Sequence, residues 1–446
     1  MKARLGRRVS GALTGLVAVA AALSGSAVAT TAAGGVMTPA IGDHPRYVVA
    51  GKLTGRRAHL DPAVTYTCQT SAPAGCYGPA QIRNAYGVAA LASRYGLNGA
   101  GRTIVIIDSF QSPTIRGDLG QFDRQFGLPD PQFNIIAPNG LTPFNPGDAD
   151  QVSWSGEISL DVEWAHAIAP AAAIDLVLAR SDRDADIFAA QQYAVSRGLG
   201  DVVSQSFGEA EQCMNSGIQA QTHQLFQQAS AMGMTVFAST GDTGAGEPTC
   251  NGSGYLKAIS TPASDPNVTA VGGSRLFADG GSGLYQSETA WDEPQYNLAG
   301  GGGYSTIYHT PGYQAGLSLP MRGVPDVAYN ASMDGGVLTV WSSSGQGPNM
   351  VFRFAGTSAG SPQWAGLAAL ADQMAGRRLG AINTQLYQLT PEVHDITAGD
   401  NTYHGRTATV NGYVARPGWD PATGLGSPRA DVLVPQLAQG GGGWGW

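Results

Sequence analysis

Short apolar segments alternate with longer helical segments through the central part of the chain. The apolar segments have the length and composition of buried strands. They are Ile104–Asp108, Ile174–Leu178, Val202–Gln205, Thr235–Ala238 and Val268–Val271. The helical segments are Gly156–Ala169, Ala185–Arg197 and Ile218–Met232. This alternation predicts an α/β fold in three layers, with a parallel sheet flanked by helices on both faces.

The length, charge and composition of the chain limit the number of domains it can form and the kinds of partner it can bind. A chain of 446 residues can bury one large α/β core or two smaller ones. The net charge of −8 argues against a nucleic-acid partner, because such proteins carry clusters of Lys and Arg. We expect a Gly/Ala/Pro-rich lead over residues 30–75, the folded domain over residues 76–437 and a Gly/Trp tail over residues 438–446.

The N-terminal segment has the pattern of a secretory signal peptide. Residues 2–8 include Lys2, Arg4, Arg7 and Arg8, and an apolar stretch of small residues follows from Gly11 to Leu23. Residues 27–29 read Ala-Val-Ala, which suits cleavage after position 29. A membrane anchor is the alternative, but the apolar stretch is short for a span. We expect residues 1–29 to be a signal peptide, and the protein to be secreted and not held in a membrane.

The four cysteines fit an oxidising compartment. Cys68 and Cys76 are close in sequence, and Cys213 and Cys250 bracket one stretch of the middle region. We expect the disulfides Cys68–Cys76 and Cys213–Cys250 among the three pairings that four cysteines permit. A structural zinc is the alternative, but this spacing does not supply paired ligands and no His pair stands beside it.

A candidate nucleophile lies near the C-terminal end. Residues 356–362 read Gly-Thr-Ser-Ala-Gly-Ser-Pro and lead into an Ala/Leu-rich helix, so a glycine turn delivers Ser358 to a helix start. The positive end of the helix dipole favours a developing negative charge at that position. Ordinary helix capping by Thr or Ser is the alternative reading of this segment.

A pair of carboxylates provides a candidate base. Glu157 and Asp161 are four residues apart on a predicted helix, so they are neighbours on one face. A solvated acidic face is the usual meaning of such a pair. A serine nucleophile, however, needs a proton acceptor, and that acceptor needs an orienting partner. Two carboxylates can fill both roles at acidic pH, where an imidazole would already be protonated.

A third carboxylate follows an apolar strand. Residues 239–244 read Ser-Thr-Gly-Asp-Thr-Gly, so Asp242 is presented at the carboxyl end of a strand between two glycines. An Asx turn would explain the local pattern. The functional interpretation is a protonated carboxylic acid that donates a hydrogen bond to an oxyanion.

Taken together, the motifs resemble the sedolisin family of serine-carboxyl peptidases, which share the subtilisin fold and use Glu in place of the histidine. The matching segments occur in the family's order and span the chain from Tyr77 to Ser427. They are Glu157–Asp161, Ser204–Gly208, Ser239–Asp242, Gly300–Ser305, Gly323–Asp326 and Gly356–Pro362. The resemblance implies a monomeric peptidase acting on polypeptides at acidic pH.

The resemblance also implies the roles of individual residues. Ser358 would be the nucleophile, Glu157 the general base, Asp161 its partner and Asp242 the oxyanion donor. One structural calcium ion would be held by the residues that match the family's site. These are the side chains of Asp395 and Asp420 and the carbonyls of Ile396, Arg416 and Gly418. Two carboxylates with carbonyls suit a hard cation, whereas a pair of Asp turns would explain the spacing alone.

The chain departs from the family pattern in three ways. The family carries a large folded propeptide, but only the lead over residues 30–75 lies between the signal peptide and the folded region. Phe207 stands where relatives often have Trp, and Arg416 where many have Gly. Asp108 ends its strand where the family tends to have Glu, and we interpret it as a supporting acid in the proton network.

Two other functions compete with this interpretation. A histidine-based subtilisin could use Asp108, Ser358 and His166, although His166 lies five residues after Asp161, off the face of the acid pair. A secreted binding protein built on an inactive peptidase fold is the other alternative. The complete Glu, Asp, Asp and Ser set argues against it.

Overall fold

The computed structural model describes residues 38–39, 47–53, 66–389 and 392–440. The expected signal peptide and residues 441–446 of the tail lie outside the described residues. The described residues all belong to one compact unit.

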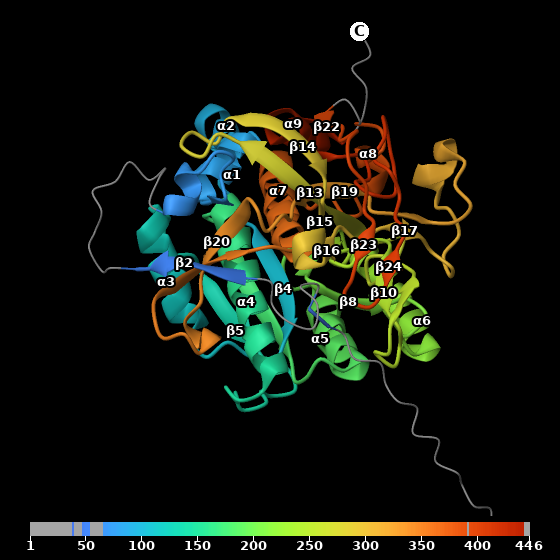
Figure 1. The fold of residues 1–446 in the computed structure, drawn as a ribbon, viewed down its shortest axis with the longest axis horizontal. Helices are drawn as coiled ribbons and strands as arrows, with labels where there is room; N and C mark the ends of the chain where they lie inside the picture. Colours follow the sequence, from blue (N-terminus) through green and yellow to red (C-terminus); the bar gives the residue numbers. More distant parts are fainter. Residues whose placement is uncertain (1–37, 40–46, 54–65, 390–391, 441–446) are drawn as a thin grey trace, which may run out of the picture. The chain divides into compact units, whose positions relative to one another are not determined.

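An eight-stranded sheet forms the centre of this unit (Figure 1). Seven of its strands run parallel, in the order β5-β6-β4-β7-β9-β13-β19, and β14 pairs antiparallel with β13. Their bounds are β4 Thr103–Ser109, β5 Phe133–Ile136, β6 Ala173–Ala179, β7 Val202–Gln205, β9 Thr235–Ser239, β13 Thr269–Ala278, β14 Tyr285–Ala290 and β19 Val327–Asn330. The five strands expected from apolar segments are all present, and the predicted parallel sheet is confirmed.

Helices cover both faces of the sheet. On one face lie α4 (Ala149–Ile168) and α7 (Gly360–Ala375), and on the other α5 (Asp184–Ser196) and α6 (Ser216–Ala231). Strand β4 shows why the apolar segments are continuous. Ile104 and Ile106 join the core beneath α4 and α7, whereas Val105 and Ile107 join the core beneath α5 and α6. Because successive side chains point to opposite faces, a strand covered on both sides must be apolar at every position.

Smaller elements surround the central layers. The other helices are α1 Pro79–Ala85, α2 Val88–Tyr95, α3 Ile115–Phe126, α8 Asn383–Leu386 and α9 Ala430–Gln439.

Several smaller sheets lie around the central one. A four-stranded sheet has the order β2 Tyr47–Lys52, β21 Met350–Phe354, β20 Gly336–Val340 and β3 Cys76–Tyr77. A three-stranded sheet has the order β1 Thr38–Pro39, β8 Phe207–Ala210 and β12 Ser260–Thr261. The two-stranded pairs are β10 Gly246–Pro248 with β11 Tyr255–Lys257, β15 Asp292–Glu293 with β16 Leu298–Ala299, β17 Gly303–Tyr304 with β18 Gly323–Val324, β22 Val393–His394 with β25 Ser427–Pro428, and β23 Tyr403–His404 with β24 Thr409–Val410.

Part of the expected lead belongs to the folded unit. Strand β2 pairs antiparallel with β21, and Tyr47 packs edge-on against Trp341 and Phe352. The segment was too short to show a period, but its Tyr and Val residues favour a strand that a partner can complete. Folded structure therefore begins before the boundary expected at residue 76.

Helix α4 begins seven residues before the predicted start at Gly156. The side chain of Asp148 caps the helix, accepting hydrogen bonds from the backbone N–H groups of Asp150 and Gln151. Gly156 is inside the helix, where a Cβ atom would lie 3.2 Å from the Trp341 ring. Close packing explains this glycine, so interpreting it as a helix boundary was wrong.

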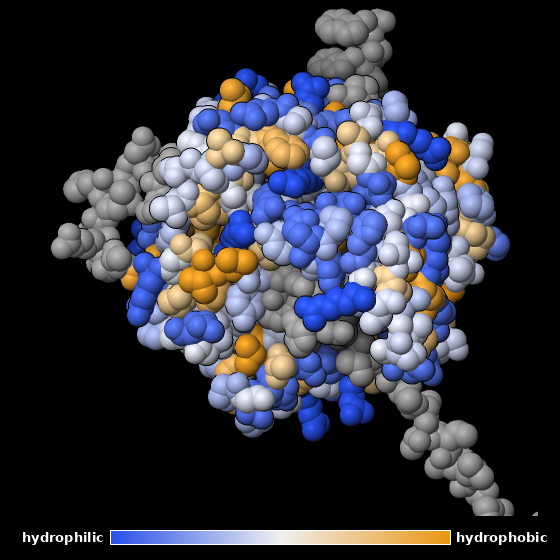
Figure 2. All heavy atoms as spheres, viewed as in Figure 1, coloured by the Kyte–Doolittle hydropathy of each residue, from blue (hydrophilic) through white to orange (hydrophobic). Residues whose placement is uncertain are grey.

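The surface shown in Figure 2 is mixed in character. Hydrophobic residues appear there in small groups separated by hydrophilic ones. Among all the described residues, the most exposed large hydrophobic side chains are Leu284 and Val414, each 69% exposed. Within the described ranges, none of the helices combines the length and the apolar character that crossing a membrane requires.

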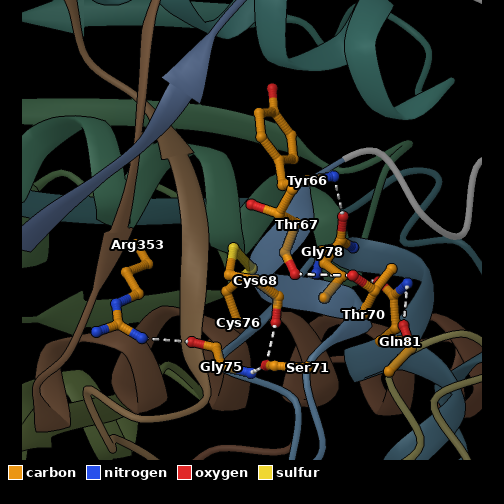
Figure 3. The surroundings of a disulfide bond; sticks show 12 residues. Tyr66, Thr67, Cys68, Thr70, Ser71, Gly75, Cys76, Gly78, Gln81 and Arg353 are labelled. Carbon is orange, nitrogen blue, oxygen red and sulfur yellow. Dashed lines mark hydrogen bonds between the residues drawn. A yellow bond between two sulfur atoms is a disulfide. The ribbon is translucent and has the colours of Figure 1, made fainter.

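Two disulfides join the pairs expected from the sequence. Cys68–Cys76 closes a loop beside β3, and Cys213–Cys250 connects the segments that follow β8 and β10. Figure 3 shows the first bond with the hydrogen bonds of its loop. The Gly75 N–H donates to the Ser71 hydroxyl at 2.8 Å, and the Arg353 guanidinium donates to the Gly75 carbonyl at 2.8 Å. The disulfide loop is thereby attached to β21.

Candidate active site

The carboxyl ends of the parallel strands bring the candidate residues to one edge of the sheet. Asp108 lies near the end of β4, Ser206 follows β7 and Asp242 lies in the loop after β9. Ser358 lies in a short 3-10 helix, η5 (Thr357–Ala359), directly before α7. In open parallel sheets, this edge is where ligands bind.

Helix α4 supplies the acid pair from one face of the sheet. Glu157 and Asp161 are both completely buried, and so is Asp108 of β4. Within the described residues, none of their carboxylate oxygens accepts a hydrogen bond of normal geometry. Three carboxyl groups buried together resist ionising at the same time, because burial and mutual repulsion both disfavour the charged form.

The pKa values of these groups follow from their surroundings. Burial raises the pKa of Glu157 well above its usual range, the negative charges of Asp161 and Asp108 raise it further, and the nearby Ser358 hydroxyl lowers it. Burial also raises the pKa of Asp161, while the nearby Ser206 hydroxyl lowers it. Burial and the charge of Asp161 raise the pKa of Asp108. The cluster therefore retains protons, and its titration belongs to the group and not to a single residue.

The backbone before Ser358 is in a conformation that favours glycine. Gly356 has φ +131°, and its N–H donates to the Ala331 carbonyl at 2.8 Å. This turn delivers Ser358 to the start of α7, where its hydroxyl lies close enough to Glu157 to lower the pKa of that carboxyl. Catalytic hydrogen bonds are often long before substrate binds, so the arrangement suits proton transfer from Ser358 to Glu157.

Asp242 is tied directly to the turn that carries Ser358. One of its carboxyl oxygens accepts hydrogen bonds from the Thr357 N–H at 2.8 Å and from the Thr357 hydroxyl at 3.0 Å. The Gly241 N–H in turn donates to the Thr357 hydroxyl at 3.1 Å. The loop after β9 and the turn that carries Ser358 are thus held together by hydrogen bonds.

Ser206 belongs to the site but was not identified from the sequence as a residue with a role. It is fully buried, and its hydroxyl donates to the Ser358 carbonyl at 3.4 Å while lying near Asp161. Its position directly after β7 could have identified Ser206 from the sequence, because the carboxyl ends of parallel strands lie at the edge of the sheet where ligands bind.

His166 lies elsewhere, against α3. Its Nε2 is 3.1 Å from a carboxylate oxygen of Asp123, and both side chains are buried. The side chain therefore leaves α4 on the face that packs against α3, whereas Glu157 and Asp161 leave it toward Ser358. The histidine-based alternative that used His166 is not supported by this arrangement.

The expected calcium ligands surround one loop. The Gly418 N–H donates to Asp395 at 3.0 Å, and the Arg416 N–H donates to Asp420 at 3.0 Å. The Ile396 carbonyl is 3.5 Å from the Thr423 hydroxyl, which also lies 3.2 Å from Asp420. The structure thus brings all five predicted residues together.

The donor set fits a hard cation. Asp420 is fully buried, and among the described residues neither it nor Asp395 forms an ion pair with Lys, Arg or His. Burial raises the pKa of Asp420, although backbone N–H groups lower it in part. In the described part of the chain, no group of three or more His, Cys, Asp or Glu side chains is placed to share a metal. A cation at this loop would need carbonyl ligands, which calcium accepts.

The buried carboxyl groups make a prediction about stability. A group whose pKa is raised in the folded state binds more protons there than in the unfolded chain, so it stabilises the fold at low pH. Glu157, Asp161 and Glu163 all have raised pKa values caused first by burial. We expect the free energy of unfolding to fall as the pH rises above about 4, by about 1.4 kcal/mol for each unit by which a pKa is raised.

This trend can be measured by urea unfolding of the protein at a series of pH values. Replacing Glu163 with Gln should make the decline less steep, because an amide does not titrate. A free energy of unfolding that increases from acidic to neutral pH would contradict the assignment of these groups.

Three comparisons relate this chain to known proteins. Residues 162–391 match the subtilase family. The chain is 36% identical over 387 residues to kumamolisin of Bacillus sp. (strain MN-32), an alignment that covers 83% of this chain and 66% of kumamolisin. It is 34% identical over 331 residues to sedolisin of Pseudomonas sp. (strain 101), covering 70% and 53% of the two chains.

A solved structure gives the same result. Pseudomonas sedolisin, a serine-carboxyl proteinase complexed with two molecules of pseudo-iodotyrostatin, superimposes with a TM-score of 0.70 and 28% sequence identity. The match covers 82% of this chain and 99% of the solved one. The chain spans only about two thirds of kumamolisin and half of sedolisin as whole proteins.

Proposed function

Because this chain belongs to the subtilase family and, within it, to the sedolisin group of serine-carboxyl peptidases, we propose that it hydrolyses peptide bonds through an acyl-enzyme on Ser358. The observation that carries the proposal is the position of Ser358 next to Glu157 within a buried set of carboxyl groups. A serine beside a base that a third group orients is the general arrangement of nucleophilic catalysis.

The first half of the reaction forms the acyl-enzyme. The ionised Glu157 accepts the proton of the Ser358 hydroxyl as the oxygen attacks the substrate carbonyl. Glu157 then donates that proton to the departing amine when the tetrahedral intermediate collapses. In the second half, water replaces the amine: Glu157 takes a proton from it, the acyl bond to Ser358 is hydrolysed, and the proton returns to the serine.

Asp242 is proposed to stabilise the oxyanion. A protonated carboxylic acid can donate a hydrogen bond to the negative oxygen, and such donors contribute most when they are fixed in advance. The bonds from Thr357 to one oxygen of Asp242 hold the carboxyl group next to the nucleophile turn. That rigidity supports the proposed role.

Asp161 and Asp108 are proposed to position and tune the base. Proton sharing among the three buried carboxyl groups lets one of them stay ionised while the others are neutral. Phe207, where relatives often have Trp, packs against Trp154 at a ring distance of 6.0 Å and cannot donate a hydrogen bond. In this chain, the proton network would therefore depend on Asp108, Asp161 and Ser206.

The proposed mechanism requires acidic solution. Asp242 must carry a proton while Glu157 must be ionised to accept one, and the first condition fails once Asp242 loses its proton as the pH rises. The test is cleavage of a mixed peptide library by the purified protein from acidic to neutral pH, with Ser358→Ala as the blank. New peptide termini that appear only with the wild-type protein would support the proposal. Termini that appear equally with Ser358→Ala, or never, would refute it.

We also propose that one calcium ion stabilises the loop around Asp420. It would be held by Asp395 and Asp420 together with the carbonyls of Ile396, Arg416 and Gly418. The hydrogen bonds from the Arg416 and Gly418 N–H groups to these two carboxylates support the proposal, because they keep the residues close together. The role of such an ion is structural, because it neutralises a buried carboxylate and fixes the loop.

The proposal that the protein is secreted rests on the N-terminal pattern and on the two disulfides.

Removal of calcium is expected to lower the melting temperature. A ligand that binds only the folded state adds about 2.7 kcal/mol at a hundredfold excess over its Kd, so chelation should remove a contribution of that order. Asp420→Ala should melt at a lower temperature and should no longer respond to chelator. Asp130→Asn, which alters an exposed acid elsewhere, should respond like the wild type. A melting curve indifferent to both calcium and chelator would rule the site out.

A further inference from the structure

Strand β2 lies at the edge of the four-stranded sheet, in the part of the chain that was expected to be an unfolded lead. It is the blue strand of Figure 1, and it pairs antiparallel with β21 from Tyr47 to Lys52. None of the residues proposed for the mechanism lies on β2. Its first residue, Tyr47, nevertheless lies between the segments that carry the nucleophile and the base.

On one side, Tyr47 is joined to the strand that leads into the nucleophile turn. Its partner in the ladder between β2 and β21 is Phe354, the last residue of β21, and the centroids of the two rings are 5.8 Å apart. Gly356, which forms the turn, follows two residues later, and Ser358 two residues after that. Strand β2 therefore holds the end of the strand that delivers Ser358.

On the other side, the Tyr47 ring packs against Trp341, the residue directly after β20. The two rings meet edge-on with their centroids 4.8 Å apart, and Trp341 is fully buried. The indole N–H of Trp341 donates to the Ser155 hydroxyl of α4 at 3.0 Å. A Cβ atom at Gly156 would lie 3.2 Å from the same indole ring. Trp341 therefore holds the helix turn that directly precedes Glu157.

Helix α4 is attached to the same sheet at a second point. The indole N–H of Trp164 lies 3.1 Å from the Leu338 carbonyl and 3.2 Å from the Thr339 hydroxyl, both on β20. This second attachment does not involve β2. Loss of the first attachment, at Trp341, would therefore let the N-terminal half of α4 move while the rest of the helix stays in place.

A small movement of this half of α4 matters, because the proposed reaction transfers a proton from Ser358 to Glu157. Proton transfer requires hydrogen-bond reach, and a misplacement of about 1 Å can lower a rate roughly a hundredfold. Among the described residues, neither carboxylate oxygen of Glu157 accepts a hydrogen bond of normal geometry. The position of Glu157 therefore depends on its helix and on the residues that pack against that helix.

We propose that Tyr47 is a positioning residue of the peptidase. By packing against Trp341, it keeps the turn of α4 that carries Glu157 at the distance from Ser358 that proton transfer requires. The inference rests on the proposed peptidase function and adds a residue outside the catalytic set to it. It also means that strand β2 remains bound in the working enzyme, because its Tyr47 ring covers Trp341.

The test compares kcat and KM of three β2 variants with those of the wild type on one peptide. Tyr47→Ala should lower kcat roughly tenfold to a hundredfold with little change in KM, because it misplaces the base without altering substrate contacts. Tyr47→Phe keeps the ring and should retain near-wild-type kcat. Val48→Ala is the matched control, since the Val48 side chain on the same strand is 41% exposed. An unchanged kcat in Tyr47→Ala, or an equal loss in Val48→Ala, would overturn the proposal.

Two further variants separate positioning from a general loss of stability. If Tyr47 acts through Glu157, Tyr47→Ala should cause no further loss of kcat once Glu157 is replaced by Gln. The same fold-loss with and without Glu157 would mean that Tyr47 only supports the fold, and would contradict the proposal. Ser155→Ala removes the acceptor of the Trp341 N–H and tests the same contact if Tyr47→Ala does not fold. It should lower kcat with little change in KM, and wild-type kinetics would refute the role of Trp341.

Hydrogen exchange tests the positioning role without using activity. In Tyr47→Ala, the backbone N–H groups of residues 152–161 of α4 should exchange faster than in the wild type, whereas those of α6 should be unchanged. If the wild-type protein cleaves no peptide, the peptidase proposal fails, and this measurement still decides whether Tyr47 holds the turn. Unchanged exchange over residues 152–161 would overturn the inference.

Discussion

Replacing Ser358 with Ala is expected to lower kcat by roughly 10⁴- to 10⁶-fold, because the variant cannot form the acyl-enzyme. The structure places this buried serine directly before α7, beside the buried Glu157. Glu157→Gln should cause a loss of similar size, since an amide of the same shape cannot accept the proton.

The two substitutions should not be additive. Once the nucleophile is missing, the base has nothing to activate, so the double variant should be about as active as either single one. Glu163→Gln is the matched control, because Glu163 is a buried acid on the same helix whose carboxylate accepts the Val340 N–H instead. The measurement is kcat of each variant on one peptide by steady-state kinetics. Near-wild-type activity of Ser358→Ala or Glu157→Gln would refute the assignment.

Replacing Asp242 with Ala is expected to lower kcat roughly 10²- to 10³-fold, the usual effect of removing one oxyanion donor. Asp242→Asn should be much less damaging in acidic solution, because an amide can donate a hydrogen bond to the same oxygen. Because the amide does not lose a proton, the asparagine variant should also keep more of its activity as the pH rises.

The comparison between the two variants distinguishes donation from packing. Both remove the carboxylate, but only Asn can still donate and still hold Thr357, which bonds to Asp242 at 2.8 Å and 3.0 Å. We would measure kcat/KM of both variants and the wild type over the same pH range. If Asn and Ala are equally impaired at every pH, Asp242 does not act as a hydrogen-bond donor.

The central sheet was predictable because each of its strands is marked by its own short run of apolar residues. Strands such as Thr103–Ser109 and Ala173–Ala179 lie between two helical layers, so they must be apolar on both faces and are visible as continuous runs. The acid pair was predictable for a similar reason. Residues four apart on a helix are neighbours whatever the rest of the fold does.

Contacts between distant segments were not predictable. The partner of His166 is Asp123 on another helix, and nothing in the sequence around either residue indicates the pair. The same holds for Glu209 and Asp184, and for Asp242 and Thr357. The expectation that a helix begins at Gly156 was wrong. A glycine is needed there because the ring of Trp341, which belongs to a segment far along the chain, packs against this position.

In the proposed mechanism, a carboxylate and not an imidazole activates Ser358. The most direct test is kcat/KM of the wild-type protein on a single peptide from strongly acidic to mildly alkaline pH. Because Asp242 must keep its proton to donate to the oxyanion, the proposed mechanism predicts a maximum in acidic solution and a loss of activity toward neutral pH. A maximum near pH 8 would contradict the claim and would mean that a histidine is the base.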